Sequence, residues 1–460
     1  MWPIYTVFLG LSVLFILPQD VIGTCSISTE PNAPIVVTRF GSKLILSDSG
    51  GSYTREEGET IELFCGSGFS RRSRNHYGSQ MNLISGVKLT MYCGSNGYFQ
   101  DERTGEAIMN IKCQKGVLQM FESRTSLQNC KTDMTLVLGQ EFNETGSIKS
   151  AALCYDIVAS QLKYIGYTTF PTKNRILAKT QLGQLNDIGF DINASYQKDL
   201  IKAVSQAEID AYMTKDKQLT QLFVGETFQT ASLVQDEAIG RQLAGYEDMM
   251  STIWMRTLRS GNWKNWVAAM RDATASGAHF DVRLGVSGVL ELPMAVGRPC
   301  NASRSLRIEL ADDSSYPIPA HIWAHVHALE KTGGVQDEFV IIGHNSPFFR
   351  GDNLSDFCPS MCDQVSWLRN SLFAGLHEFP AYGLVQCCRV EDVASKLDNF
   401  PGAFAKASAT ATGNTAKVKL LDLFIPSSGP SIDPSSEPSS DPSIDPSSDP
   451  SSDPDYKIYD

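Results

Sequence analysis

Histidine is missing from the whole central part of this chain. The seven histidines are His76, His279, His321, His325, His327, His344 and His377, so residues 77–278 contain none. A neutral imidazole is the side chain best suited to take up a proton near pH 7. Chemistry that needs a histidine base within residues 77–278 is therefore excluded.

The chain also lacks a strongly basic balance and, after its N-terminus, any long apolar run. Its net charge of −12 comes from 39 basic and 51 acidic residues, which argues against a general electrostatic affinity for nucleic acid or anionic membranes. Residues 427–460 hold eight acidic residues and one lysine, so they supply −7 and leave −5 for the rest. No later run reaches the roughly 18 apolar residues that a membrane helix needs. The folded part is therefore only mildly acidic, and local basic patches are compatible with it.

The N-terminus resembles a secretory signal, although Lys and Arg are absent before its apolar run. That run covers residues 5–17, and small or β-branched residues precede a cut before Thr24. We therefore expect residues 1–23 to be a signal peptide and the mature protein to be secreted, extracellular and free of membrane. Four Asn-x-Ser/Thr sequons are consistent with glycosylation on this route, at Asn143, Asn193, Asn301 and Asn353.

Cysteine is plentiful after the expected cut. An oxidising compartment would pair most of the 11 cysteines, and the odd number leaves one thiol free or paired between chains. Zinc binding by Cys358 and Cys362, or by Cys387 and Cys388, is the weaker interpretation because no second Cys/His pair has zinc-finger spacing. The cysteines are Cys25, Cys65, Cys93, Cys113, Cys130, Cys154, Cys300, Cys358, Cys362, Cys387 and Cys388.

Residues 24–135 are typical of a small β module stapled by disulfides. Short β-rich runs at 43–46, 60–65, 87–93 and 108–113 alternate with Gly and Ser, and three of them end in cysteine. A basic loop, Arg71-Arg72-Ser73-Arg74 followed by His76, could contact phosphate or could simply be solvated.

Residues 136–425 have the longer, mixed pattern of an α+β domain. We expect strands at 153–158, 282–292, 318–329 and 339–343, and helices at 197–213 and 262–275. Trp263, Trp266, Val267 and Met270 share one helix face and are interpreted as core. Residues 426–460, a Pro/Ser/Asp repeat, cannot bury an apolar face and are expected to be a disordered tail.

The run 319–327 places several histidines on one face of an expected strand. His321, Trp323, His325 and His327 alternate with the apolar residues between them. Three imidazoles on one face could bind zinc. A half-buried strand with a polar outer face explains the same alternation.

Several motifs of residues 130–401 resemble the DNA/RNA non-specific endonucleases, in particular their secreted arthropod branch. The resemblance implies a ββα-metal fold and a nucleic-acid substrate. It rests on Cys154-Tyr155-Asp156, Gly261-Asn262-Trp263, Gly285-Val286-Ser287-Gly288-Val289-Leu290-Glu291-Leu292-Pro293, Pro317-Ile318-Pro319 with Trp323 and His327, and Ile341-Ile342-Gly343-His344-Asn345-Ser346-Pro347.

Active members of that family carry a histidine base and an asparagine that holds hydrated magnesium. An ungapped comparison from Asn262 places these groups at Gln229 and Met250, whereas a gapped one places the histidine at Gln242. A glutamine amide is no base near neutral pH, and a thioether is a poor ligand for magnesium. The resemblance therefore implies a nuclease frame whose catalytic groups are lost.

The function expected from the sequence is a secreted, nuclease-like pseudoenzyme that binds DNA or RNA without a cofactor. One alternative is an active magnesium-dependent nuclease whose base is His279 or a histidine of the strand 321–327. Another is a secreted glycoprotein that binds protein partners through its β module and tail. The sequence leaves the oligomeric state open. The candidate nucleic-acid contacts are Arg256, Arg259, Asn262, Lys264 and Arg271.

Overall fold

The computed structural model describes most of the chain between residues 23 and 404. The described ranges are 23–28, 34–40, 43–47, 52–75, 78–84, 86–108, 110–114, 116–142, 146–159, 161–170, 175–176, 181–195, 203–223, 227–292, 304–309, 315–330, 337–349 and 357–404. All of them belong to the first of two compact units, Met1–Lys406. The expected signal peptide and tail lie outside the described residues, apart from residue 23.

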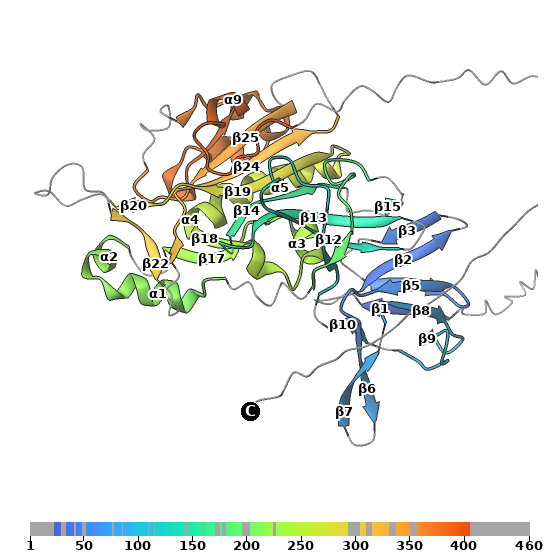
Figure 1. Ribbon diagram of the computed structural model, residues 1–460. Helices are drawn as coiled ribbons and strands as arrows, with labels where there is room; N and C mark the ends of the chain where they lie inside the picture. Colours follow the sequence, from blue (N-terminus) through green and yellow to red (C-terminus); the bar gives the residue numbers. More distant parts are fainter. Residues whose placement is uncertain are drawn as a thin grey trace, which may run out of the picture. The chain divides into compact units, whose positions relative to one another are not determined.

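Antiparallel sheets make up the N-terminal part (Figure 1). One has six strands in the order β15 (Arg175–Ile176), β3 (Lys43–Ser47), β2 (Ile35–Phe40), β5 (Thr60–Phe64), β8 (Lys88–Cys93) and β9 (Phe99–Asp101). Another has β10 (Ile111–Cys113), β6 (Phe69–Asn75) and β7 (Gly78–Ile84), and β1 (Thr24–Ser28) pairs with β4 (Ser52–Glu56). The four expected β runs are confirmed, although the last is strand only from Ile111.

The basic cluster at residues 71–74 is not in a loop. It lies within β6, which forms an antiparallel hairpin with β7. The prediction of a basic loop is therefore wrong about the backbone, because residues 71–74 pair with β7 along the hairpin. The side chains of residues 71–75 and the whole of His76 lie outside the described residues.

Five disulfides connect ten of the cysteines. They are Cys25–Cys93, Cys65–Cys113, Cys130–Cys154, Cys358–Cys388 and Cys362–Cys387. The pairs formed by Cys358, Cys362, Cys387 and Cys388 exclude the zinc interpretation, since a disulfide sulfur has no thiolate to offer a metal. Disulfides of this number are typical of proteins that fold in an oxidising compartment. No described helix is long and apolar enough to cross a membrane.

The disulfide pattern leaves Cys300, which lies outside the described residues, as the eleventh cysteine. Alkylation in denaturant without reductant should therefore label Cys300 and none of the other ten cysteines. If Cys300 joins two chains instead, it stays unlabelled and a dimer band appears on a non-reducing gel. Peptide mass spectrometry makes the measurement, and labelling of any other cysteine would contradict the pairing.

A nine-stranded antiparallel sheet forms the centre of the α+β part. Its strands, in order, are β16 (Ile192–Asn193), β11 (Gln119–Glu122), β12 (Met134–Glu141), β13 (Ser147–Asp156), β14 (Gln161–Thr168), β19 (Phe280–Ser287), β24 (His321–Ala328), β25 (Glu338–His344) and β26 (Val385–Cys388). The sheet begins at Gln119, upstream of the boundary expected at residue 136. The strands expected at 153–158, 318–329 and 339–343 fall within it, with small shifts at their ends. The run expected as one strand at 282–292 is divided, because β19 ends at Ser287 and residues 291–292 form β20 in a separate sheet.

Short helices flank this sheet. They are α1 (Gln206–Lys215), α2 (Lys217–Leu222), α3 (Glu237–Gln242), α4 (Arg256–Leu258), α5 (Lys264–Ala275), α7 (Ser366–Arg369), α8 (Leu372–Leu376) and α9 (Val390–Val393). Single turns lie at η3 (Glu247–Met250), η7 (Cys362–Gln364) and η8 (Pro380–Tyr382), and a π-helical turn, η4, at Arg259–Trp263. Three strand pairs complete the fold: β17 (Phe228–Ser232) with β18 (Ser251–Met255), β20 (Glu291–Leu292) with β21 (Arg304–Ser305), and β22 (Arg307–Glu309) with β23 (Ser315–Pro317).

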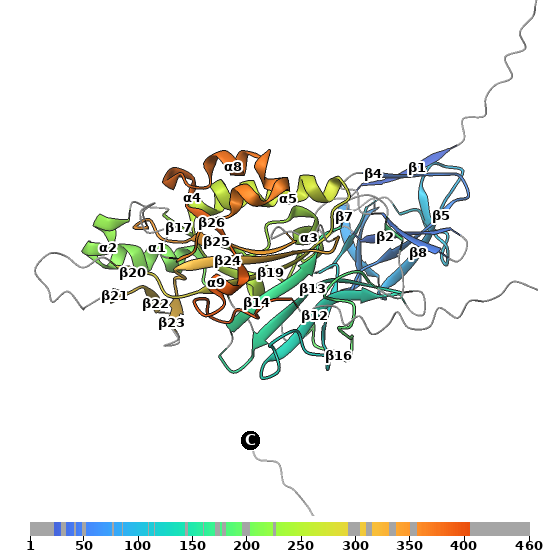
Figure 2. The same cartoon turned by 90° about the horizontal axis from the view of Figure 1, so that it is seen from above.

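Both faces of the nine-stranded sheet are buried. Helices α5 and α8 lie on one face and α9 on the other (Figure 2). Alternate residues of β24 accordingly divide between two cores, with Ile322, Ala324 and Val326 in one and Trp323 in the other. The alternation predicted for this strand is confirmed, but the expected solvated face is wrong, because residues 397–404 cover it. The predicted core stripe on α5 is confirmed, since Trp263, Trp266, Val267 and Met270 are all buried.

Candidate functional site

The stretch 227–275 folds as two antiparallel strands followed directly by a helix. Strands β17 and β18 pair along their whole length, from Phe228 opposite Met255 to Ser232 opposite Ser251. The Arg256 N–H donates to the Thr227 carbonyl and closes the pair at the point where α4 begins. The turns α4 and η4 and the helix α5 then lead to Ala275, with a kink at Gly261, whose φ of −98° and ψ of −114° are not helical. The chain thus turns from a strand pair straight into a helix that starts with arginine.

The π-helical turn η4 lies very close to the turn η8. A Cβ on Gly261 would stand 2.3 Å from the Tyr382 carbonyl oxygen, and one on Gly383 would stand 2.4 Å from the Leu258 Cα. Only glycine permits this approach, and Gly383 also has a φ of +79°. The two glycines therefore hold residues 258–263 and 380–383 together.

Asn262 secures the same contact. Its Nδ2 donates to the Leu376 carbonyl at 2.7 Å and to the Gly383 carbonyl at 2.6 Å, and the side chain is fully buried. Asn262 was expected to contact nucleic acid; that expectation is wrong, because both amide hydrogens are used inside the protein. The Gly261-Asn262-Trp263 motif instead has a structural role, because it connects η4 to the turn η8.

Asn345 has a similar role at the other side of the strand pair. Its Oδ1 accepts from the Met255 N–H at 2.5 Å, and its Nδ2 donates to the Ile253 and Pro319 carbonyls at 3.0 and 2.9 Å. The preceding His344 is also fully buried and its Nε2 lies 2.8 Å from the Gln386 Oε1. Asn345 therefore connects β18 to the central sheet, and its amide is bonded to three backbone groups inside the protein.

The ungapped positions of the lost catalytic groups lie at opposite ends of the strand pair. Gln229 stands opposite Trp254 near the start of α4, whereas the Met250 carbonyl accepts from the Leu233 N–H. Four residues of strand separate Gln229 from Leu233, a distance of about 13 Å. A base and a metal ligand must reach the same phosphate. The ungapped comparison is therefore wrong as a description of one catalytic centre.

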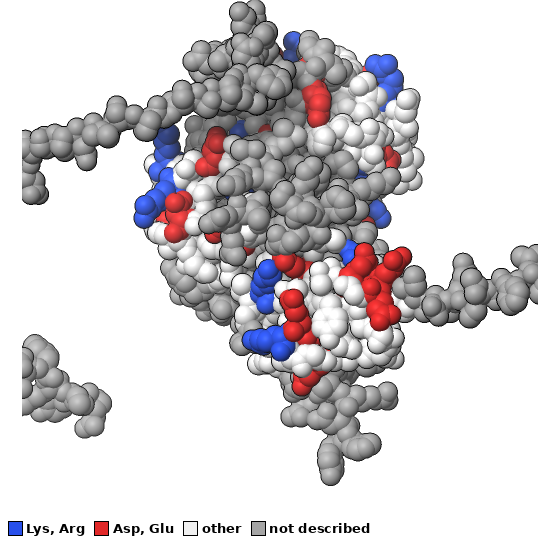
Figure 3. All heavy atoms as spheres, turned by 90° about the vertical axis from the view of Figure 1, so that its right-hand side faces the viewer, with Lys and Arg blue, Asp and Glu red and all other residues white. Residues whose placement is uncertain are grey.

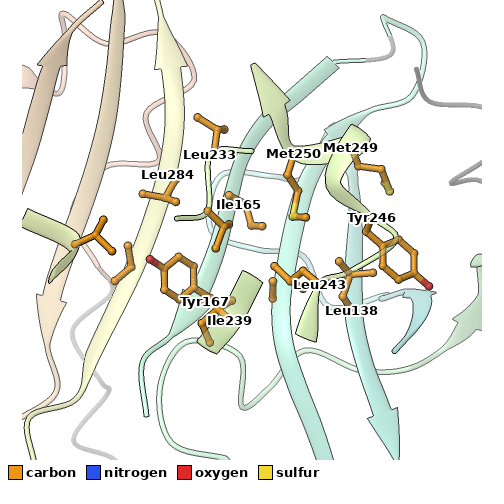
Figure 4. Packing of buried hydrophobic residues seen from close by; sticks show 14 of the residues in the cluster. Leu138, Ile165, Tyr167, Leu233, Ile239, Leu243, Tyr246, Met249, Met250 and Leu284 are labelled. Carbon is orange, nitrogen blue, oxygen red and sulfur yellow. The ribbon is translucent and has the colours of Figure 1, made fainter. Parts of the chain in front are cut away.

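Met250 is core. Its side chain is 1% exposed and lies in the apolar layer that Figure 4 shows, with Leu233, Leu243 and Ile165. A hydrated magnesium ion keeps several of its waters, and the side chains next to Met250 in this layer, Leu233 and Leu243, are apolar. The expectation that Met250 replaces a metal ligand is accordingly wrong.

Gln242, the alternative position for the lost histidine, faces the central sheet. It ends α3, and its Oε1 accepts from the Ser150 hydroxyl of β13. Gln229 remains partly exposed in β17. Neither glutamine can act as a base near neutral pH, whichever comparison is used.

Arg271 and Lys264, both expected to contact nucleic acid, differ in their surroundings. Arg271 on α5 pairs with the buried carboxylate of Asp236 at 3.4 Å, and Asp236 in turn caps α3 by accepting from the Ala238 and Ile239 N–H groups. Burial raises the pKa of Asp236, against the attraction of Arg271. Arg271 therefore serves the α3–α5 contact, and its assignment to nucleic acid stays a prediction, since 21% of its side chain is exposed. Lys264, by contrast, is exposed.

Arg256 and Arg259 occupy the first turns after β18. Both are half-buried, and Arg259 belongs to η4. Burial lowers the pKa of the Arg259 guanidinium. Among the residues that the structure describes, no carboxylate forms an ion pair with Arg259, and its buried Nε has no hydrogen-bond partner. A desolvated guanidinium in this position is a group that an anion would stabilise.

The histidines of β24 do not form a zinc site. The Nε2 of His325 lies 2.9 Å from the Glu338 Oε1, and the rings of Phe400 and Phe404 lie 5.1 and 4.5 Å from its ring centre. His321 instead packs against Phe357, with ring centres 4.9 Å apart. In the described ranges, the one group of side chains close enough to share an ion contains Cys130 and Cys154, which are disulfide-bonded.

The histidines considered as the base of an active nuclease lie outside the strand pair β17–β18. The ring of His325 is fully buried beneath Phe400 and Phe404. His279, which lies between α5 and β19, is 24% exposed at its side chain and pairs through Nδ1 with the Glu330 Oε1 at 2.6 Å. Neither histidine lies in β17 or β18, so the structure offers no observation that favours the active-nuclease alternative.

Other expected features fall mainly outside the site. Asn193, the one sequon asparagine that the structure describes, is exposed, whereas Asn143, Asn301 and Asn353 lie outside the described residues. Figure 3 shows one face of the molecule on which described basic and acidic side chains lie interspersed.

Residues 376–383 complete the site, and the sequence analysis did not single them out. The signal available was the short run Phe379-Pro380-Ala381-Tyr382-Gly383, which carries two aromatic side chains around a turn signal. Nothing local connects this run to a helix about 120 residues earlier. No protein-family model matches the chain, and no curated protein matches its sequence.

Proposed function

We propose that this protein is an exported, catalytically inactive relative of the nucleases, which binds nucleic acid through phosphate contacts at the start of the helix 256–275. The observation that carries the proposal is the desolvated Arg259, which lies beside Arg256 directly after the strand pair β17–β18. The strand–strand–helix order agrees with the fold that the family resemblance implies. Five disulfides agree with export.

Phosphate suits this position for physical reasons. A guanidinium forms two parallel hydrogen bonds to phosphate oxygens. Removing Arg259 from water with no carboxylate partner among the described residues costs free energy, and a bound phosphate would recover it. Lys264, five residues after Arg259 and exposed, adds a third positive charge. The mild net charge of the folded part then limits binding to this local patch.

Replacing both arginines should weaken nucleic-acid binding strongly. For Arg256→Gln with Arg259→Gln we expect at least about a tenfold loss of affinity at low salt, and a salt slope reduced by about 1.8 because two phosphate contacts are lost. A filter-binding titration against salt measures both. The matched control is Arg103→Gln, an exposed arginine of the β module, which should leave both values unchanged.

The outcomes separate cleanly. Binding that is absent at low salt, or independent of salt, contradicts phosphate contacts altogether. Binding that persists unchanged in the double variant places the contacts elsewhere.

Incubation with magnesium should leave plasmid DNA and RNA intact, because residues 77–278 contain no histidine and the positions of Gln229 and Met250 do not converge. Agarose gels after prolonged incubation make the measurement. Cleavage that disappears in a His325→Ala, His327→Ala variant would instead support the active-nuclease alternative. Cleavage that survives in that variant would point to His279, to be tested by His279→Gln.

A further inference from the structure

We infer that the site prefers single-stranded nucleic acid, whose unpaired bases stack on the exposed aromatic rings of Phe379 and Tyr382 while the neighbouring arginines hold the phosphates. This inference rests on the proposed function and adds the class of ligand to it. The four residues 379–382 are called the aromatic turn below.

The aromatic turn presents two large rings to solvent. Phe379 is 56% exposed and Tyr382 is 45% exposed, whereas many other aromatic side chains, such as Trp254, Trp263 and Trp266, are fully buried. The backbone of the turn is held by a hydrogen bond and a proline. Its backbone carries an N–H to carbonyl bond from Tyr382 to Phe379, and Pro380 restricts the start of the turn. Two exposed rings on a fixed turn are a candidate binding surface.

The aromatic turn lies next to the basic start of the helix. The Tyr382 carbonyl oxygen stands where a Cβ of Gly261 would be, and Gly383 stands against Leu258. Arg259 and Lys264 lie within three residues of Gly261, and both α4 and η4 contact η8. Side chains as long as arginine and lysine therefore start beside the aromatic turn.

This combination fits single strands better than a duplex. Base-to-ring stacking needs a base face that is not already covered by its neighbours, and single-stranded binding proteins combine such rings with a positive track for the backbone. A duplex keeps its bases stacked inside and offers only phosphates to this surface. Glu378, exposed just before the aromatic turn, reduces the positive charge there. Stacking must therefore supply the preference for single strands.

The test measures binding of the full-length protein to three labelled probes of about 15 nucleotides, within the range that single-strand sites occupy. They are an oligo-dT strand, an abasic strand with the same phosphates, and a duplex. Fluorescence anisotropy is recorded for the wild type, for Phe379→Ala with Tyr382→Ala, and for Tyr382→Trp. The matched control is Tyr98→Ala, which removes an aromatic ring that is 48% exposed on the β module.

We expect the alanine pair to lose at least about tenfold in affinity for oligo-dT and to bind the abasic strand and duplex as the wild type does. Tyr382→Trp should retain or improve oligo-dT binding, and Tyr98→Ala should change nothing. Equal losses on all three probes, or no loss on oligo-dT, would overturn the inference while leaving phosphate binding intact. Absence of wild-type binding to every probe at low salt would overturn the proposed function as well.

Discussion

Lowering the pH from about 8 to about 5 should reduce the free energy of unfolding by about 4 kcal/mol through two buried histidines alone. Burial lowers the pKa of His325 to about 4 and that of His344 to about 3, from an ordinary value of 6.5. Both side chains are fully buried. Each neutral ring is therefore stable in the folded protein at a pH where it would be charged in the unfolded chain.

The sign follows from proton uptake. Below pH 6.5 the unfolded chain binds a proton at each of these histidines, while the folded protein does not until its own pKa is reached. Stability is therefore complete above about pH 6.5 and decreases as the pH falls toward about 4, by about 2 kcal/mol per histidine at pH 5. Burial also lowers the pKa of His321 to about 4, which acts in the same direction.

The charges around these rings modify the slope without reversing it. Glu338 opposes the lowered pKa of His325, whereas Arg283 and His327 reinforce it. His321 lowers the pKa of His344 further. Burial raises the pKa values of Asp236 and Asp281, and these carboxyl groups favour the folded state more as the pH falls. They reduce the net loss and leave the contribution of each histidine unchanged.

Urea unfolding at several pH values measures the effect. His344→Gln should flatten the pH dependence by about one proton, that is by about 1.4 kcal/mol per pH unit, whatever it does to stability at pH 8. The control, Leu372→Ala, shortens an exposed apolar side chain that does not titrate and should leave the slope unaltered. A free energy of unfolding that is constant between pH 8 and pH 5 would contradict the burial of these histidines.

Gly261→Ala should destabilise the protein by about 4 kcal/mol. The new Cβ would stand 2.3 Å from the Tyr382 carbonyl oxygen, so the turns η4 and η8 must separate. The separation weakens the two bonds from Asn262 Nδ2 to the Leu376 and Gly383 carbonyls. Buried polar groups left without partners cost about 1–3 kcal/mol each, and steric overpacking costs a similar amount.

Gly375→Ala is the matched control for this change. It lies in α8 of the same region, it is exposed, and a Cβ there would meet nothing within 4 Å. We expect it to be neutral or to stabilise the protein by up to about 1 kcal/mol, since alanine favours helix over glycine. Thermal or urea unfolding compares the two variants. Equal stabilities would show that the close contact between η4 and η8 does not exist.

Part of the fold was predictable because its signals are local. The alternation in residues 321–328 predicts a strand, and the spacing of Trp263, Trp266, Val267 and Met270 predicts a buried helix face. Both are confirmed. The expected helix 197–213 is confirmed only over Gln206–Met213 within α1, and the chain before residue 203 lies partly outside the described residues. Strand pairing and cysteine partners were not predictable, because they join segments far apart in the chain.

The candidate site was predicted less well than the fold. The sequence marked Asn262 and Arg271 as nucleic-acid contacts because they are polar and close to the motif, but the structure gives each a partner within the protein. The ungapped comparison assigned Met250 to the place of the metal ligand from its distance in sequence to Asn262. A distance in sequence cannot show that the side chain of Met250, at the end of η3, is buried in the core. Motif residues such as Asn345 are buried and form hydrogen bonds that connect strands. In sequence they resemble ligand-binding residues, because both kinds of residue are polar.

The sequence by itself determined the absence of a histidine base between residues 77 and 278, since composition needs no fold to be decisive. It also determined the mild charge of the folded part and the odd number of cysteines. Only the tertiary structure decided which polar groups are available. Burial and hydrogen bonding use Asn262, Arg271 and Asn345, and leave Arg259 desolvated beside the aromatic turn. Those distinctions depend on contacts between residues about 120 positions apart, such as Gly261 with Tyr382, and no local pattern carries them.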